Sequence, residues 1–200
     1  MHDTPTFPVL DNNLYQQWYA QSITDPGAFW GEQAERFLQW DRPWTNIATG
    51  EFAQGTVRWF EGGQLNVSVN CLDRHIPTRA NKTALLWVAE DGREERYTYQ
   101  QLLDAVVEMA STLRALGIKA GDRVGIYLPM IPMAAISMLA CARIGAVHTT
   151  IFSGFSAEAL CTRLRDAQCS LLITCDEANR AGKVVPLKVI ADEAIQKVPE

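Results

Sequence analysis

Residues 122–174 read DRVGIYLPMIPMAAISMLACARIGAVHTTIFSGFSAEALCTRLRDAQCSLLIT, and the alternation within this segment indicates the fold class. Three short apolar runs, at 122–129, 146–152 and 169–174, have the composition of buried strands. The two segments between them carry apolar residues at helical spacing. Strand, helix, strand, helix, strand is the pattern of two βαβ units. We therefore predict an α/β fold in which a parallel βαβαβ sheet, buried on both faces, has flanking helices.

Upstream of these units, a β-hairpin and a capped helix are expected. The runs TALLWVAE (83–90) and REERYTY (93–99) flank a DG pair, which favours a tight turn between two strands. Thr98 and Gln101 form a capping box that opens the following helix, and Gly117 ends it. Downstream, a last helix is expected from about residue 186.

The first 80 residues differ in composition from the rest of the chain, because they hold five of the six tryptophans. Asp25 and Pro26 suit the N-cap and first turn of a helix that continues to Trp40. The stretch NVSVNCLDRH (66–75) predicts a second helix, capped by Asn66. We expect two regions, a mostly helical, aromatic-rich segment at 1–80 and an α/β region at 81–200.

Charge and cysteine content restrict the class of protein. Eighteen Lys and Arg against 23 Asp and Glu give a net charge of −5, which argues against a nucleic-acid or anionic membrane partner. An odd count of five cysteines without a CxxC motif indicates reduced thiols in the cytoplasm. No signal peptide is apparent, and two prolines break the uncharged run at 124–142, so no membrane span is expected.

The sequence contains no self-contained catalytic or metal constellation. Cys71 and His75 lie four residues apart but lack a second ligand pair, so no metal site is predicted. No glycine-rich dinucleotide or phosphate-loop motif follows a strand, which disfavours a nicotinamide-dependent oxidoreductase. The segment SGFS (153–156) does not fit the nucleophile-elbow pattern. No residue of the chain is assigned a catalytic role.

The candidate binding residues lie where two strands end. In a parallel sheet the carboxyl ends of the strands share one edge, and ligands of open α/β sheets bind outside that edge. The turns at 153–156 and 176–183 should therefore lie close together. Arg180 offers a planar fork that matches phosphate oxygens, and Lys183 adds a second positive charge. Gly154 and Gly182 allow a ligand to approach the backbone closely.

The alternative at this stage is a solvated loop. On spacing alone, the commoner arrangement is that Arg180 and Lys183 pair with Asp176 or Glu177 or simply solvate the loop, because surface ion pairs are frequent.

Four blocks of the chain resemble acetyl-CoA synthetases, which are AMP-forming acyl-CoA ligases of the adenylate-forming superfamily. The blocks are DPGAFWGEQAERFLQW (25–40), LNVSVNCLDRH (65–75), LPMIPMAAISMLACARIGAVHTTIFSGFS (128–156) and ITCDEANRAGKVVPLK (173–188). Propionyl-CoA synthetases share many of them and are the alternative, although NCLDRH is closer to the acetyl type. A second alternative is a stand-alone module that binds CoA or a nucleotide without ligase activity.

The resemblance implies a two-step reaction for the full-length protein. Acetate and Mg·ATP give acetyl-adenylate and pyrophosphate, and the CoA thiol then displaces AMP. In the family, the turn that matches Arg180, Ala181, Gly182 and Lys183 helps to bind the nucleotide and phosphate part of CoA. The glycine that matches Gly154 lies against the same ligand.

The resemblance also shows departures. Ser153 stands where the family usually has glycine, Met133 where it usually has glutamate, and Lys183 where many relatives have arginine. The phosphate loop, the adenine and Mg²⁺ motifs, the acetate pocket and the mobile C-terminal domain of the family do not occur in these 200 residues. We therefore expect residues 81–200 to be the first, incomplete part of the AMP-dependent synthetase/ligase domain. The rest of the enzyme would be its packing partner, and the piece alone is expected to be inactive.

Overall fold

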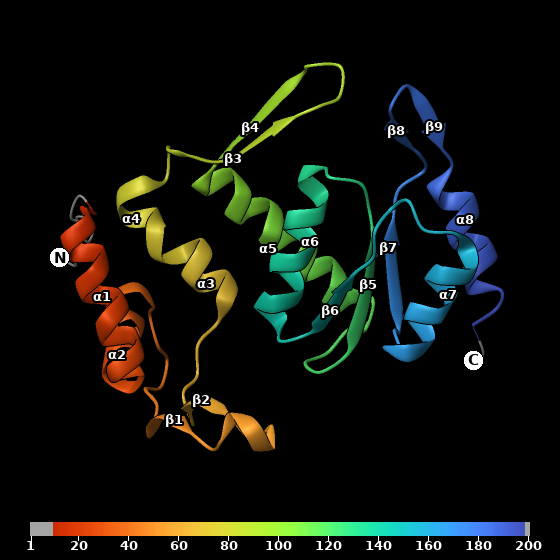
Figure 1. The fold of residues 1–200 in the computed structure, drawn as a ribbon. Coiled ribbons are helices and arrows are strands. Elements are labelled where there is room, and N and C mark those ends of the chain that lie inside the picture. The colour runs from red at the N-terminus through yellow and green to blue at the C-terminus, as the bar shows by residue number, and fades with distance from the viewer. Residues whose placement is uncertain (1–9, 199–200) are drawn as a thin grey trace. The chain divides into compact units, whose positions relative to one another are not determined.

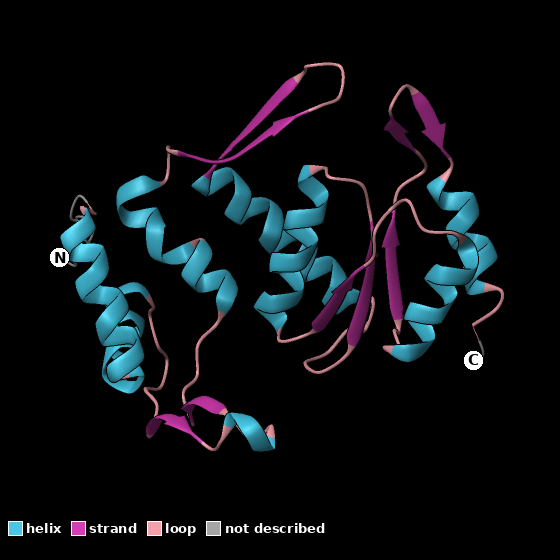
Figure 2. Cartoon of the chain, viewed as in Figure 1, coloured by secondary structure: helices cyan, strands magenta, loops and turns pink. Residues whose placement is uncertain are grey.

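The computed structural model describes residues 10–198, drawn in Figures 1 and 2. Contacts between Cα atoms divide the chain into two compact units, Met1–Asn66 and Val67–Glu200. The predicted boundary near residue 80, between the aromatic-rich segment and the α/β domain, stays a prediction.

The first unit combines two helices with a small antiparallel strand pair. Its elements are α1 (Asn12–Thr24), α2 (Pro26–Phe37), β1 (Asn46–Thr49), the 3-10 helix η1 (Phe52–Gln54) and β2 (Arg58–Glu61). As predicted, the Asp25 side chain caps α2 by accepting a hydrogen bond from the Ala28 amide. The helix does not continue to Trp40, because the chain leaves the helical region after Phe37. The Trp40 indole then folds back and donates to the carbonyl of Ala34 at 3.1 Å.

Neither α1 nor the β1–β2 pair was predicted from the sequence. No residue of α1 is buried, so the helix lacks the apolar stripe on which a prediction would rest. It is capped by the side chain of Asp11, which accepts from the Leu14 amide.

The second unit contains the predicted α/β core. Its elements are α3 (Val67–Cys71), the 3-10 helix η2 (Asp73–His75), α4 (Ile76–Arg79), β3 (Thr83–Val88), β4 (Glu94–Thr98), α5 (Tyr99–Ala115), β5 (Arg123–Tyr127), α6 (Pro132–Ile144), β6 (Val147–Thr150), α7 (Ala157–Asp166), β7 (Leu171–Thr174), β8 (Ala178–Arg180), β9 (Lys183–Val185) and α8 (Leu187–Ile195). The β3–β4 hairpin is antiparallel, and the Thr98–Gln101 capping box is formed at the start of α5. These predictions are confirmed.

The sheet has the strand order β6-β5-β7, and both pairings are parallel. Figure 1 shows α5 and α6 on one face of this sheet and α7 and α8 on the other. The chain therefore crosses over β5 after β6, and β5 is the central strand. Only β5 is buried along most of its length; β6 and β7 are half-buried or exposed, because each is an edge of the sheet. The prediction that all three strands are buried on both faces is wrong for these two.

Two hydrophobic clusters hold the helices to the two faces. One forms between β5, α5 and α6 and includes Val106, Val124 and Ala140. The other forms between β5, α7 and α8 and includes Tyr127, Leu160 and Leu187. Within residues 10–198, no helix has the length and apolar character needed to cross a membrane.

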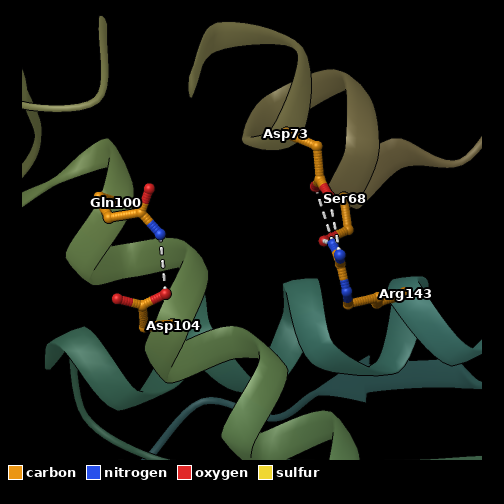
Figure 3. A network of polar contacts seen from close by, with 5 residues as sticks. All are labelled: Ser68, Asp73, Gln100, Asp104 and Arg143. Atoms are coloured by element: carbon orange, nitrogen blue, oxygen red, sulfur yellow. Dashed lines mark hydrogen bonds and ion pairs between the residues drawn. The ribbon is translucent and has the colours of Figure 1, made fainter. Parts of the chain in front are cut away.

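The segment 66–75 is not one helix, contrary to the prediction. The helix breaks at Leu72, whose side chain is buried and whose backbone leaves the helical region. The break presents Asp73 to α6, where its two carboxylate oxygens accept from the Arg143 guanidinium at 2.7 and 2.8 Å. Figure 3 shows this pair beside Ser68, whose hydroxyl accepts from the same guanidinium. The contact holds the α3–η2 segment on the sheet-covering helix α6.

Candidate functional site

The central strand β5 ends at a topological switch point. Because the chain continues from β5 to one neighbouring strand and then crosses to the other, the turns that follow β6 and β7 leave the sheet on either side of β5. Crevices at such points are the usual ligand sites of open α/β sheets. The candidate residues lie in the segments that follow β6 and β7, at the carboxyl ends of these strands.

Gly154 and Arg180 are close neighbours, as the sequence predicted. A β-carbon built on Gly154 would collide with Nη1 of Arg180 and would lie 2.6 Å from Cε1 of Phe152. The Arg180 guanidinium lies over the Phe152 ring, with its Cζ 4.8 Å from the ring centroid. Only a residue without a side chain at position 154 lets the arginine take this place.

A buried tyrosine holds the turn that carries Gly154. Tyr127 is the last residue of β5 and is fully buried. Its hydroxyl donates toward the carbonyl oxygens of Phe155 at 2.9 Å and Ser153 at 3.2 Å. Burial is the main cause that raises the pKa of Tyr127, so the hydroxyl keeps its proton at neutral pH. Because Ser153 takes part through its carbonyl oxygen, this contact does not depend on the Ser153 side chain.

Residues 176–183 form more than a polar loop. They include a short β-hairpin, in which β8 pairs with β9 and Ala181 and Gly182 make the two-residue turn. Both turn residues have positive φ, 50° for Ala181 and 71° for Gly182. Positive φ at both central positions is the mark of a type I′ hairpin turn. The hairpin escaped prediction because its strands have three residues each and its turn lacks the usual Asn-Gly or Asp-Gly pair.

The hairpin places its two cationic side chains side by side. Arg180 and Lys183 are cross-strand partners at the turn, and directly opposed residues point to the same face of a hairpin. Like charges in such a pair repel each other, and a bound anion relieves that repulsion. The pair is thus suited to hold a phosphate group, with the fork on Arg180 and a point charge on Lys183.

The alternative of an internal ion pair is not what the structure contains. Across the described part of the chain, no ion pair joins Arg180 or Lys183 to Asp176 or Glu177. All four side chains are exposed. The guanidinium of Arg180 therefore remains available to an anion while it rests on Phe152.

The tip of the hairpin also borders a groove. The two hairpins β3–β4 and β8–β9 and the segment after β5 border a cavity of about 770 Å³. Its lining includes Trp87, Glu90, Pro129, Met130, Ala181 and Gly182. The indole of Trp87 donates to the carbonyl of Met130 at 2.7 Å, and the Glu90 carboxylate accepts from the Ala181 amide at 2.5 Å. One amide of the predicted anion-binding turn is thus already bonded.

Three contributors to this region were missed at the level of sequence. Tyr127, Phe152 and Glu90 act on the candidate turns through contacts between distant parts of the chain. Tyr127 could have been singled out as a polar side chain at the end of a buried strand. Phe152 and Glu90 carry no comparable signal in the sequence.

The described residues offer no site for a metal ion. Within 10–198, no three His, Cys, Asp or Glu side chains are grouped so that they could hold one. All five cysteines are free thiols.

The chain is thus an open α/β protein that carries two exposed cationic side chains on a hairpin after its edge strand β7. Comparison with protein families gives the particular group. Residues 72–199 match the AMP-binding enzyme family, and the chain belongs to this family. Residues 15–71 match the family described as acetyl-coenzyme A synthetase N-terminus. The resemblance seen in the sequence blocks is confirmed.

Individual relatives agree with this assignment. The chain is 52% identical over 192 residues to an acetyl-coenzyme A synthetase of Saccharophagus degradans, covering 96% of this chain and 30% of the relative. It is 48% identical over 191 residues to the enzyme of the same name from Alcanivorax borkumensis, covering 95% and 30%. Acetoacetyl-CoA synthetase from Streptomyces lividans has a similar structure, with a TM-score of 0.85 and 30% identity over 99% of this chain and 30% of that one. The chain thus spans about 30% of the length of these relatives.

Proposed function

We propose that the chain is the N-terminal part of an acetate–CoA ligase of the AMP-forming type. The complete enzyme activates acetate with ATP to acetyl-adenylate and pyrophosphate, and the CoA thiol then displaces AMP. Support comes from the acetyl-coenzyme A synthetases that align with nearly the whole chain. The free thiols of all five cysteines favour the cytoplasm as its location.

Within that reaction, we assign this chain a share in CoA binding. Arg180 and Lys183 would contact phosphate oxygens of the CoA nucleotide. Gly154 would lie beside the same ligand and makes room for the Arg180 guanidinium, while the open surface at Gly182 would let the ligand approach the backbone. Ala181 contributes main chain only. The observation that carries the proposal is the contact between Gly154 and the Arg180 guanidinium, because it places an exposed pair of cations at the edge where such ligands bind.

ATP, Mg²⁺ and acetate are substrates or cofactors of the complete enzyme. The described residues do not fit a metal, so no step at Mg²⁺ is assigned to them. The remainder of the enzyme, which would bind these groups, is also the partner that packs on this chain.

Arg180→Ala in the complete enzyme tests the CoA assignment. A charge-assisted hydrogen bond contributes about 1.5–3 kcal/mol, so the KM for CoA should rise about 10- to 100-fold. Acetate-dependent exchange of pyrophosphate into ATP, which precedes CoA, should keep its rate.

Arg163→Ala is the matched control. Arg163 also lies over a phenylalanine, with its Cζ 4.2 Å from the centroid of Phe155, but it belongs to α7 and not to the hairpin. Its loss should leave the KM for CoA unchanged. An Arg180→Ala enzyme with the CoA dependence of the wild type would remove the hairpin from the CoA site.

A further inference from the structure

The tip of the β8–β9 hairpin is tied to the other hairpin of the second unit. Glu90 follows β3, and its carboxylate accepts a hydrogen bond from the backbone amide of Ala181 at 2.5 Å. The two residues are 91 positions apart in the chain. Neither hairpin's own pairing requires this contact, so it links two elements that otherwise fold locally.

The turn has a backbone amide that is not used in the pairing of β8 with β9 and can donate to such an acceptor. In a two-residue hairpin turn the closing hydrogen bonds belong to the flanking residues, here Arg180 and Lys183. The amides of the two central residues are left without a partner in the ladder. A carboxylate that accepts from one of them makes a charge-assisted bond, stronger than a neutral one.

Glu90 itself is held in place. It lies in the tight turn where the Ala89 amide donates to the carbonyl of Arg93 at 2.8 Å and the Gly92 amide donates to the carbonyl of Ala89 at 2.9 Å. The strand before it is fixed to the segment after β5 through the Trp87 indole. The carboxylate thus acts from a defined position.

The hairpin is anchored at its base and held from two sides at its tip. Ala178 is buried, and Val185 packs on the cluster between β5, α7 and α8. At the tip, Phe152 supports the Arg180 guanidinium on one side, and Glu90 bonds to Ala181 on the other. Loss of either contact would let the tip swing about its buried base, and both cations would move with it.

We propose that Glu90 is a positioning residue for the cationic hairpin, holding the turn so that Arg180 and Lys183 face an anionic nucleotide. This inference rests on the proposed function. The carboxylate bonds to the backbone, and no ion pair joins it to either cation in residues 10–198. It therefore orders the turn without neutralising the charges that the ligand needs.

The test is a titration of the complete enzyme with CoA, in which selective ¹⁵N labelling of alanine and glycine allows the amide signals of Gly154, Ala181 and Gly182 to be followed. Without ligand, Glu90→Ala should move the Ala181 signal upfield and speed its exchange with solvent, since the amide loses its acceptor. With CoA, Glu90→Ala should weaken binding about 3- to 10-fold. Glu90→Gln keeps an acceptor oxygen and should restore most of the affinity.

Two further variants distinguish a failure of the positioning role of Glu90 from a failure of the proposed CoA site. Glu177→Gln removes a charge from the lining of the same groove but not the bond to Ala181, and it should bind CoA like the wild type. Arg180→Ala reports on the proposed function. If Arg180→Ala weakens CoA binding and Glu90→Ala does not, or if Glu90→Ala tightens it, the positioning role is overturned alone. If Arg180→Ala binds CoA as tightly as the wild type, the proposed place of the hairpin in the CoA site is overturned, and the positioning role falls with it.

Discussion

Replacing Gly154 with alanine tests whether this turn is built around the Arg180 guanidinium. The added β-carbon would lie 2.6 Å from Cε1 of Phe152 and would overlap Nη1 of Arg180. Carbon atoms in favourable contact lie about 3.5–4.0 Å apart, so the ring must shift by about 1 Å or the guanidinium must leave. Gly154 does not have positive φ, so the collision alone opposes the substitution.

The magnitude follows from the two contacts that must yield. An exposed cation–π contact contributes about 0.5–1 kcal/mol, and forcing the Phe152 side chain off its rotamer costs about 0.5–1.5 kcal/mol. The free energy of unfolding should therefore fall by about 1–2.5 kcal/mol. In an Arg180→Ala background the cation–π term is already lost. There, alanine at 154 should cost about 0.5–1 kcal/mol less.

Urea unfolding of the four proteins of this double-mutant cycle, followed by far-ultraviolet circular dichroism, measures the coupling. Gly27→Ala is a suitable control, because the nearest atom to its added β-carbon, Oδ1 of Asp25, is 3.7 Å away. It lies in α2 and should raise stability by up to about 1 kcal/mol. If Gly154→Ala and Arg180→Ala prove additive, or Gly154→Ala is as harmless as the control, the packing described for this turn is wrong.

Four other substitutions test contacts in and around the site. The hydrogen bond from Arg143 is the main cause that lowers the pKa of Asp73 below its ordinary value of 3.8. The pair therefore stabilises the fold fully above pH 3.8, and this stabilisation is lost as the pH falls through the lowered pKa. Acid titrations of the free energy of unfolding should show this loss in the wild type and not in Asp73→Asn. Ala181→Asn suits the positive φ of the turn and should raise the free energy of unfolding by up to about 1 kcal/mol in urea titrations. Tyr127→Phe removes the donor to two carbonyl groups and should lower the thermal midpoint, at a cost of about 1 kcal/mol. By contrast, Ser137→Ala removes a buried hydroxyl without a partner and should leave that midpoint unchanged or higher.

The parallel core was predictable because its signals are local. Strands β5–β7 lie within short, largely apolar runs, and the intervening helices have local start signals: Pro132 in the first turn of α6, and Ser156 as the N-cap of α7, whose side chain accepts from the Ala159 amide. The shared edge of parallel strands then follows from topology, which is why the neighbourhood of Gly154 and Arg180 could be predicted without coordinates. The strand order could not, since nothing in a βαβαβ pattern says on which side of β5 the third strand pairs.

The remaining features depend on contacts that are distant in sequence. The Tyr127 hydroxyl reaches a carbonyl 28 residues away, and Glu90 reaches an amide 91 residues away. The position of Tyr127 at the end of a buried strand marks it as a polar group that needs a partner but does not say which one, and Glu90 does not differ in the sequence from an ordinary surface glutamate. The break of the 66–75 helix has the same origin, because the ion pair of Asp73 with Arg143 spans 70 residues. Tertiary contacts here override the local preference for a continuous helix.

The two halves of the candidate site are held by opposite means, and this difference has a consequence for binding. The turn that carries Gly154 is fixed from inside, by a fully buried tyrosine that bonds its carbonyl groups. The hairpin that carries Arg180 is fixed at its surface, by an exposed aromatic ring and an exposed carboxylate. Surface contacts of this kind contribute little free energy each, so the hairpin is the half that a bound anion can order further. Affinity for the ligand should therefore respond to changes at the hairpin tip much more than overall stability does, whereas changes beneath Gly154 should affect both.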